Sequence, residues 1–203
     1  MPEDMHQHGH SHHHGAWTAE QLKRLQHPDR EQWMPRGPVM AAINAPFGGR
    51  VADVGAGLGW LTFPLAVAVG QSGRVLAIDP SEQGISSIRE RADREGLSQI
   101  ETLVAAAEST GLPDDYLDRI VWHTMYHDVH DRRKAIREML RILKSGATWI
   151  IVDWEKEDTD MGPPQEVRMS PDEVTQEVTQ AGFRVVDRWK AGPVTWGITA
   201  EKP

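Results

Sequence analysis

The most informative spacing in the chain is a glycine-rich run with an acid in front of it, DVGAGLGW at residues 53–60. Glycines let a backbone turn approach a ligand closely, and a helix that follows points its first amide groups at the ligand. A dinucleotide site requires G-x-G-x-x-G, but Trp60 stands where its third glycine would be. A carboxylate at Asp53 would repel a pyrophosphate and attract an ammonium group. The run therefore favours a cationic nucleoside without phosphates. The residues predicted to contact it are Asp53, Gly55, Ala56, Gly57 and Gly59.

A second acid, Asp79, ends the next apolar run and is followed by Pro80. An acid at a strand end about 20 residues after the glycines can accept hydrogen bonds from both ribose hydroxyls. An acid before Pro and Ser is also an ordinary signal for the start of a helix. Because Asp79 occurs together with Asp53 and the glycines, we predict that Asp79 and Pro80 bind the ribose.

Titratable side chains are densest, outside the N-terminal segment, in the run WHTMYHDVH at residues 122–130. His127 is the candidate general base, with Tyr126 or Asp128 to orient it. The alternative is that His127 stabilises its own loop. We expect His123 to line the cofactor pocket rather than to take part in chemistry.

Asp153 opens a connection that is long for a compact domain and continues to Arg168. We predict that Asp153 lies near the acceptor and belongs to the catalytic residues, with Trp154 as an apolar wall. A rigid proline turn with exposed charges is the competing interpretation.

Short apolar runs alternate with helical stretches from residue 50 onward, which indicates an α/β fold with a parallel sheet wound on both faces. The predicted strands cover residues 50–54, 74–78, 101–105, 117–123, 148–153, 183–189 and 194–200. The predicted helices cover residues 61–69, 81–95, 136–143 and 170–182. The last two strands should form an edge hairpin with one face covered. Ligands of such sheets bind beyond the carboxyl ends of the strands, near the switch point of the strand order.

Three segments are predicted. Residues 1–16 carry six histidines among small polar residues and should be a disordered tail with adventitious affinity for divalent metals. Residues 17–45 should form an N-terminal helical lid, with Thr18 and Gln21 at capping-box spacing. Residues 46–203 should form the catalytic domain.

Four features, in this order, resemble the class I S-adenosylmethionine-dependent methyltransferases. They are the glycine run 53–59, the acid Asp79, the sequence LKSG at 143–146 and the sequence AGF at 181–183. The resemblance runs from about Asp29 to the end. It implies a methyltransferase with S-adenosylmethionine as cofactor. It also implies a Rossmann-like, doubly wound, seven-stranded and mostly parallel sheet with a final antiparallel edge hairpin, preceded here by a helical extension.

The same resemblance assigns the loop after the third strand to the adenine. Many relatives have an acid where this chain has Ala106. The resemblance therefore implies that backbone groups of Ala106 and Ala107 contact the base, with Glu108 as a possible surrogate acceptor. Methyl transfer itself needs alignment of acceptor, methyl carbon and sulfur more than it needs covalent chemistry from the protein.

The amino-acid composition limits the kinds of ligand and partner that the chain is expected to bind. The net charge of −8 disfavours non-specific nucleic-acid binding, and the lack of cysteine removes thiolate metal sites and arsenite-type methyl transfer. No apolar run reaches membrane-spanning length, and a cytoplasmic protein with a small-molecule acceptor is expected. The alternatives are a nicotinamide-dependent oxidoreductase, a non-catalytic nucleoside- or metal-binding protein, and an RNA methyltransferase with a local basic strip.

Overall fold

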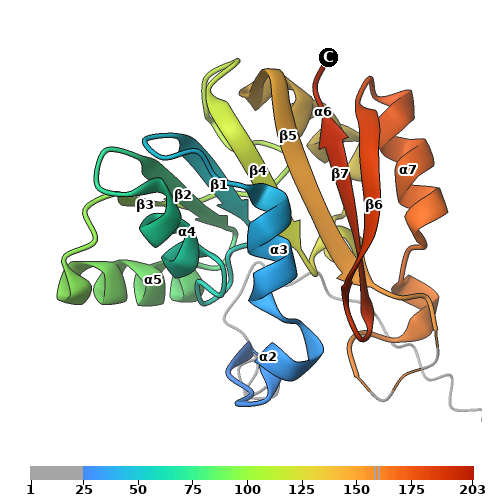
Figure 1. The fold of residues 1–203 in the computed structure, drawn as a ribbon, viewed down its shortest axis with the longest axis horizontal. Helices are drawn as coiled ribbons and strands as arrows, with labels where there is room; N and C mark the ends of the chain where they lie inside the picture. The colour runs from blue at the N-terminus through green and yellow to red at the C-terminus, as the bar shows by residue number, and fades with distance from the viewer. Residues whose placement is uncertain (1–24, 158, 160) are drawn as a thin grey trace, which may run out of the picture.

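Seven strands form a single sheet in the order β3-β2-β1-β4-β5-β7-β6 in the computed structural model, which describes residues 25–157, 159 and 161–203 (Figure 1). Strands β1 to β5 are parallel, and β7 is antiparallel to both of its neighbours. The strand order reverses between β1 and β4, which makes this the switch point. The strands are β1 (Arg50–Val54), β2 (Arg74–Asp79), β3 (Ile100–Val104), β4 (Leu117–His123), β5 (Leu143–Trp154), β6 (Arg184–Gly192) and β7 (Thr195–Glu201).

Helices cover both faces of this sheet, as the alternating pattern predicted. One face packs against α3, α4 and α5, and the other packs against α6 and α7. The helices are α2 (Arg30–Trp33), α3 (Arg36–Ile43), α4 (Thr62–Val69), α5 (Glu82–Glu95), α6 (Arg132–Ile142) and α7 (Pro171–Gln180), with short 3-10 turns η1 (Tyr126–Asp128) and η2 (Gln165–Val167). The predicted Rossmann-like fold with a final antiparallel hairpin is confirmed.

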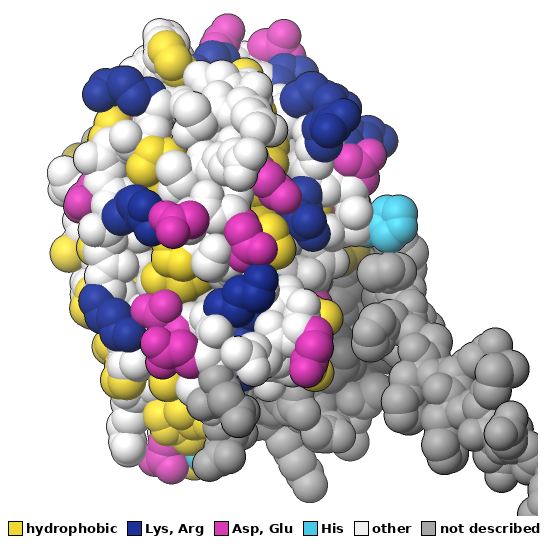
Figure 2. All heavy atoms as spheres, turned by 90° about the vertical axis from the view of Figure 1, so that its right-hand side faces the viewer, with side chains coloured by type: hydrophobic (Ala, Val, Ile, Leu, Met, Phe, Trp, Pro, Cys, Tyr) yellow, Lys and Arg dark blue, Asp and Glu magenta, His cyan; other side chains and the backbone are white. Residues whose placement is uncertain are grey.

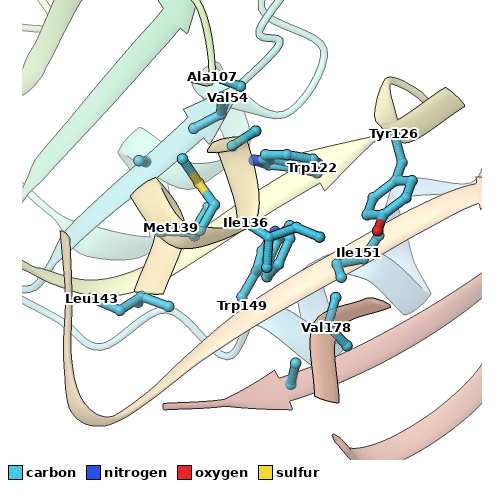
Figure 3. Packing of buried hydrophobic residues seen from close by; sticks show 14 of the residues in the cluster. Val54, Ala107, Trp122, Tyr126, Ile136, Met139, Leu143, Trp149, Ile151 and Val178 are labelled. Atoms are coloured by element: carbon cyan, nitrogen blue, oxygen red, sulfur yellow. The ribbon is translucent and has the colours of Figure 1, made fainter. Parts of the chain in front are cut away.

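The layer under α6 and α7 is built around aromatic side chains (Figure 3). Trp122 and Trp149 are fully buried with ring centroids 4.7 Å apart in an edge-to-face arrangement, and Phe183 lies 5.2 Å from Trp149. Aromatic pairs in such arrangements add stability beyond the area that they bury. The result is a rigid wall under the carboxyl ends of β4 and β5.

Helix α3 belongs to the packing of the domain. Its Val39 and Ile43 are buried among the side chains of β1, β4 and β5. Pro35 precedes the helix and Pro38 lies in its first turn, where the missing amide hydrogen costs nothing. The helical lid predicted for residues 17–45 stays a prediction, because α3 is fixed on the sheet and residues up to 24, with Thr18 and Gln21, lie outside the described residues. The histidine-rich segment lies outside them as well.

The hairpin prediction was right about pairing but wrong about exposure. Strand β7 lies between β5 and β6, so it has a neighbour on each side. Its residues Thr195 to Ile198 are buried, which contradicts the expectation of one covered face. The edge is β6, where five of nine residues are exposed. Alternation in β7 was misleading because Trp189 of β6 covers the face that carries the threonines: its ring lies against Gly197, and its Nε1 donates to the hydroxyl of Thr199.

The end of α6 also differs from the prediction. Leu143 was expected on the helix, but it begins β5 and pairs with Leu117. Gly146, expected to stop the helix, lies within β5 with φ at +74° and donates its backbone N–H to the carbonyl of Lys202. The predicted start of α7 is confirmed, since Ser170 and Glu173 form a capping box in front of Pro171.

The surface over β6 and α7 alternates in charge sign (Figure 2). Ion pairs on this face join Arg184 to Glu201 and Arg188 to Asp172. Lys and Arg interspersed with Asp and Glu do not make the continuous basic strip that an RNA substrate would need. Within the described part of the chain, no helix has both the length and the apolar character required to cross a bilayer.

Candidate active site

A cavity of about 70 Å³ lies at the carboxyl ends of β1 and β4, at the switch point. Five of the residues predicted to contact the cofactor line it, together with residues that sequence reasoning did not select. Its lining residues are Leu25, Arg30, Asp53, Gly55, Ala56, Gly57, Trp60, Leu61, His123 and Thr124. Helix α2, which carries Arg30, lies below the carboxyl ends of the central strands in Figure 1.

A larger cavity of about 390 Å³ lies at the opposite end of the strands, next to Arg50, Arg74 and Lys144. Its charged groups pair with one another, Arg74 with Glu101 at 3.1 Å and Lys144 with Asp118 at 2.5 Å. Ligands of open α/β sheets bind at carboxyl ends. The smaller cavity is therefore the candidate active site.

The glycine run makes a tight turn over the end of β2. The backbone N–H groups of Gly55 and Ala56 both donate to the carbonyl of Ile78. Gly55 has φ at +75°, and a Cβ there would stand 2.5 Å from the sulfur of Met125. Gly59 has φ at +83°, and a Cβ there would stand 2.6 Å from the ring of Phe63. Both positions require glycine.

Asp79 joins this turn to the start of α5. One carboxylate oxygen accepts from the backbone N–H of Gly57 at 2.9 Å, and the other accepts from that of Ser81 at 2.8 Å. Burial raises the pKa of Asp79, and these two backbone donors counteract that shift. Each oxygen keeps a second lone pair for a ligand. Pro80 is exposed beside it.

The loop after β3 reaches Asp79, since the N–H of Ala105 donates to the Asp79 carbonyl. Ala106 is half-buried, and its carbonyl accepts from Ser109. Ala107 is buried in the core cluster under α6. Glu108 accepts from the backbone N–H of Asp131 at 3.2 Å, so its carboxylate is used within the protein. Five of the predicted cofactor residues do not line the cavity: Gly59, Asp79, Pro80, Ala106 and Ala107.

Asp53 is buried in the cavity wall and accepts a hydrogen bond from the Thr62 hydroxyl at 2.7 Å. Burial raises the pKa of Asp53 to about 6, and the Thr62 hydroxyl limits this rise. His123 lies on the same wall, and burial together with Arg30 lowers its pKa to about 3. The imidazole of His123 is therefore neutral at physiological pH, as expected of a pocket wall.

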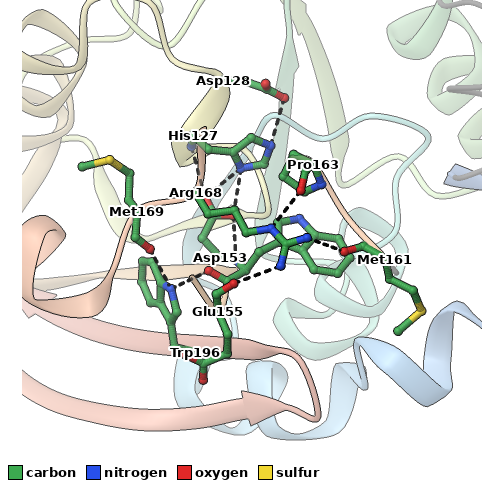
Figure 4. A network of polar contacts seen from close by, with 10 residues as sticks. His127, Asp128, Asp153, Glu155, Met161, Pro163, Arg168, Met169 and Trp196 are labelled. Carbon is green, nitrogen blue, oxygen red and sulfur yellow. Dashed lines mark hydrogen bonds and ion pairs between the residues drawn. The ribbon is translucent and has the colours of Figure 1, made fainter. Parts of the chain in front are cut away.

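His127 and Asp153 form a buried pair at the carboxyl ends of β4 and β5 (Figure 4). The Nδ1 atom of His127 is 2.8 Å from Asp153, and its Nε2 atom is 3.4 Å from Asp128. Burial acts to lower the pKa of His127, but the two carboxylates outweigh it and raise the pKa to about 10. At neutral pH the ring is consequently an imidazolium held between two carboxylates.

Tyr126 was predicted beside this pair, but the structure places it elsewhere. Its ring is fully buried in the aromatic layer, 5.6 Å from that of Trp122. Its hydroxyl donates to Glu177 of α7 at 2.7 Å, and burial with Glu177 raises the tyrosine pKa. The prediction that Tyr126 orients His127 is corrected, since the partners of His127 are Asp153 and Asp128.

The long connection after β5 is held by Arg168, which is almost fully buried (Figure 4). Its guanidinium makes five hydrogen bonds to the connection itself. The acceptors are the carbonyls of Pro163, Glu155, Glu157 and Met161 and the hydroxyl of Thr159. Gly162 lies against the Trp154 ring, where a Cβ would stand 2.7 Å from it. The described residues of the connection form a wall next to His127 (Figure 4).

Arg30 and Thr124 are two of the five cavity residues that sequence reasoning missed, and the other three are Leu25, Trp60 and Leu61. Arg30 comes from a short charged helix, and no periodicity signals that its side chain is buried. Thr124 has φ at +55°, an unusual value for a β-branched residue. It directly follows β4, and a position after a strand at the switch point is the one signal that could have drawn attention to it.

Three features of this edge fit S-adenosylmethionine. Two buried carboxylates, Asp53 and Asp79, flank a glycine turn that brings backbone close to the cavity. The buried Nε2 of His123 has no hydrogen-bond partner among the described residues. The carboxylate of Asp53 next to the glycines would repel a diphosphate at this turn.

Comparisons with known proteins agree with this geometry. A family described as a methyltransferase domain matches residues 52–151. The ubiquinone/menaquinone biosynthesis C-methyltransferase UbiE of Vibrio vulnificus is 33% identical over 110 residues, which cover 54% of this chain and 42% of that protein. The UbiE protein of Vibrio campbellii is 29% identical over 184 residues, covering 75% of this chain and 70% of that protein. The chain thus spans less than half the length of the Vibrio vulnificus protein.

A solved structure of a SAM-dependent methyltransferase from Aquifex aeolicus covers the fold almost completely. It is 30% identical, has a TM-score of 0.86, and the match covers 93% of this chain and 100% of that one. The chain belongs to the class I S-adenosylmethionine-dependent methyltransferases.

Proposed function

We propose that this chain transfers a methyl group from S-adenosylmethionine to a small-molecule acceptor. The observation that carries the proposal is the pair of buried carboxylates, Asp53 and Asp79, on either side of a glycine turn at the switch point. When bound, S-adenosylmethionine supplies a methyl group that its sulfonium has already activated. The mixed charge of the face over β6 and α7 (Figure 2) and the named biosynthetic role of the UbiE relatives support a small molecule rather than a nucleic acid.

The chain's own residues would hold the cofactor as follows. Asp53 would bind the ammonium group, and Asp79, with Pro80 beside it, would bind the ribose hydroxyls. Backbone groups of Ala106 and Ala107 would contact the adenine. Neutral His123 would close the wall next to the reacting end without adding a charge that repels a sulfonium.

On the acceptor side we assign His127 and Asp153. Asp153 fixes the imidazole through Nδ1, and Nε2, which pairs with the exposed Asp128, would take the acceptor's proton when the acceptor replaces Asp128 as its partner. Because the pKa of His127 is raised to about 10, the ring must first lose a proton before it can act as a base. We therefore expect turnover of a protic acceptor to rise with pH from 7 toward 10.

Native mass spectrometry and calorimetry with S-adenosylmethionine, its demethylated product and NAD test the proposal. We expect the first two to bind and NAD not to bind. Asp79→Asn should weaken the binding of S-adenosylmethionine about 10- to 100-fold, because one charged acceptor is lost. Asp118→Asn is the matched control, since Asp118 is a paired carboxylate at the opposite strand ends. Binding of NAD instead, or equal affinity in Asp79→Asn and the wild type, would contradict the proposal.

Two further expectations stay predictions: a cytoplasmic location, and adventitious binding of divalent metals by the histidine-rich segment 1–16. We also propose that residues 17–45 and the connection held by Arg168 enclose the bound substrates, since excluding water strengthens the electrostatic contacts inside a site.

A further inference from the structure

The larger cavity, at the amino ends of the strands, takes no part in the proposed methyl transfer. Its volume of about 390 Å³ is in the range of cavities that hold small molecules. No aliphatic side chain lines it among the described residues. The charged residues of its lining are Arg50, Arg74, Glu101, Asp118 and Lys144. A ligand of this cavity must therefore be polar.

The charges in this lining do not cancel. Arg74 pairs with Glu101 and Lys144 pairs with Asp118, but the guanidinium of Arg50 forms no ion pair within 4.0 Å of it in the described part of the chain. Three cations thus stand against two carboxylates, in a chain whose net charge is −8. A local positive excess in a concave site favours an anionic ligand.

Arg50 is held in place without a carboxylate. Its guanidinium carbon lies 4.7 Å from the centroid of the Tyr116 ring, and its backbone N–H donates to Asp118 at 2.8 Å. The backbone N–H of Tyr116 donates in turn to the carbonyl of Ile142. A guanidinium stacked on a ring keeps the N–H groups of its edge free for an oxyanion. Arg50 is therefore oriented for an anion before one binds.

Further donors line the same cavity from other segments. The turn before β2 contributes Ser72 and Arg74, and β5 contributes Lys144. The backbone N–H of Arg74 donates to the carbonyl of Gly49 at 2.9 Å, which ties this turn to the residue before Arg50. Guanidinium, ammonium and hydroxyl groups on three segments can donate to more oxygens than the two of a carboxylate. A phosphate group, with three terminal oxygens in its esters, matches them better.

We propose that this cavity binds the phosphate group of a small polyol phosphate or sugar phosphate, with Arg50 as its principal contact. Arg74 and Ser72 would bind the remaining phosphate oxygens. The carboxylates of Glu101 and Asp118 can only accept hydrogen bonds when ionised, so they would bind hydroxyl groups of the ligand. This site is separate from the proposed cofactor site, because the two lie at opposite ends of the strands.

The test is a titration of ¹⁵N-labelled protein with glycerol phosphate, inorganic phosphate, acetate and glycerol at low, constant ionic strength. Amide shifts at residues 48–50 and 72–74 report binding. We expect a dissociation constant of about 1 mM or lower for glycerol phosphate, weaker binding of inorganic phosphate, and no saturable shifts with acetate or glycerol. No cofactor is added, so the result does not depend on the proposed methyltransferase activity.

Two substitutions should change the affinity for glycerol phosphate in opposite directions. Arg50→Met keeps the backbone bond to Asp118 and should weaken binding about 10-fold, since a charge-assisted contact is lost. Glu101→Gln should strengthen binding about 3- to 10-fold, because it removes a repelling charge and frees Arg74. Arg89→Met is the matched control and should have no effect. Arg89 is exposed, forms no ion pair among the described residues and lies outside the cavity.

Three results would overturn the assignment. They are the absence of saturable shifts up to about 20 mM glycerol phosphate, acetate binding as tightly as inorganic phosphate, and equal weakening in Arg50→Met and Arg89→Met. Equal weakening would mean that the anion is attracted by the general surface charge and not by this cavity. If Arg50→Met folds poorly by near-ultraviolet circular dichroism, Arg50→Lys keeps the charge without the planar fork and should bind with intermediate affinity.

Discussion

Two buried arginines at the same edge of the sheet, Arg168 and Arg30, have different surroundings. Arg168 is 3% exposed and makes five hydrogen bonds, all to the connection that it holds. Arg30 is 6% exposed, and within the described part of the chain it makes one bond, to a backbone carbonyl, and keeps a buried nitrogen unpaired. Equal burial therefore does not imply an equal role. A cation whose donors are all used holds the chain, whereas one with a spare donor beside a cavity is prepared for a ligand.

The largest effect is expected from Arg168→Met. It leaves four carbonyls of the connection without their charged donor, and we expect a loss of about 3–5 kcal/mol in the free energy of unfolding. Urea denaturation measures this loss, and amide exchange should show that residues 155–168 lose protection. A change below about 1 kcal/mol would mean that water replaces the guanidinium and that the connection does not depend on it.

The buried pair of His127 and Asp153, whose polar atoms are hydrogen-bonded as those of Arg168 are, should make the free energy of unfolding depend on pH. The pKa of His127 is raised to about 10, so the folded state holds a proton that the unfolded state releases near pH 6.5. The contribution is thus fully present below pH 6.5 and is lost as the pH rises toward 10, on the order of 3 kcal/mol. Unfolding by urea across this range measures it. Asp153→Asn should flatten the profile, and an unchanged slope would contradict the pairing.

The carboxylate of Asp53, which lines the same cavity as Arg30, should affect folding stability with the opposite dependence on pH, and Asp53→Asn should remove this effect. The pKa of Asp53 is raised to about 6, so its ionised form destabilises the fold increasingly as the pH rises from about 4 to 6. At pH 7.5 the amide, which can still accept from Thr62, should stabilise the ligand-free protein by about 1–2 kcal/mol. Thermal unfolding at pH 4 and pH 7.5 checks this, with a gain expected only at the higher pH. The same variant should bind S-adenosylmethionine more weakly.

The smallest effect is expected from Arg30→Met in the ligand-free protein. Relief of a buried cation offsets the lost bond to the Leu25 carbonyl and the lost stacking on Trp60, so the free energy of unfolding should change by less than about 1 kcal/mol. The same substitution at Arg168 is the comparison. If both variants lose several kcal/mol, the distinction between the two arginines fails.

Much of the fold could be predicted from the sequence because it follows from local patterns. Buried parallel strands are continuous apolar runs, and acids at strand ends meet at one edge of a sheet, which is why Asp53 and Asp79 could be identified. The exposure of β7 could not be predicted, because it depends on which strand inserts next to β5. Periodicity reports a strand but not its neighbours.

The glycine turn of the candidate site could be predicted from the sequence. The contacts between residues far apart in the sequence could not. Tyr126 is next to His127 in sequence, but its side chain points into the aromatic layer. There its hydroxyl donates a hydrogen bond to Glu177 of α7. Arg30 reaches the cavity from a short helix far from the glycine run. Both arrangements arise from packing between elements distant in sequence, and such contacts leave no motif.

The position of β7 between β5 and β6 has a consequence for how the chain assembles. Strand β6 is synthesised before β7 but pairs only with it within the sheet. It therefore has no partner strand until β7 has emerged and paired with β5. During synthesis, the half of the sheet around the glycine turn can form while β6 is still unpaired. Chaperone binding, strand-specific proteolysis or exchange with another copy would all be expected to act first at β6 during this interval.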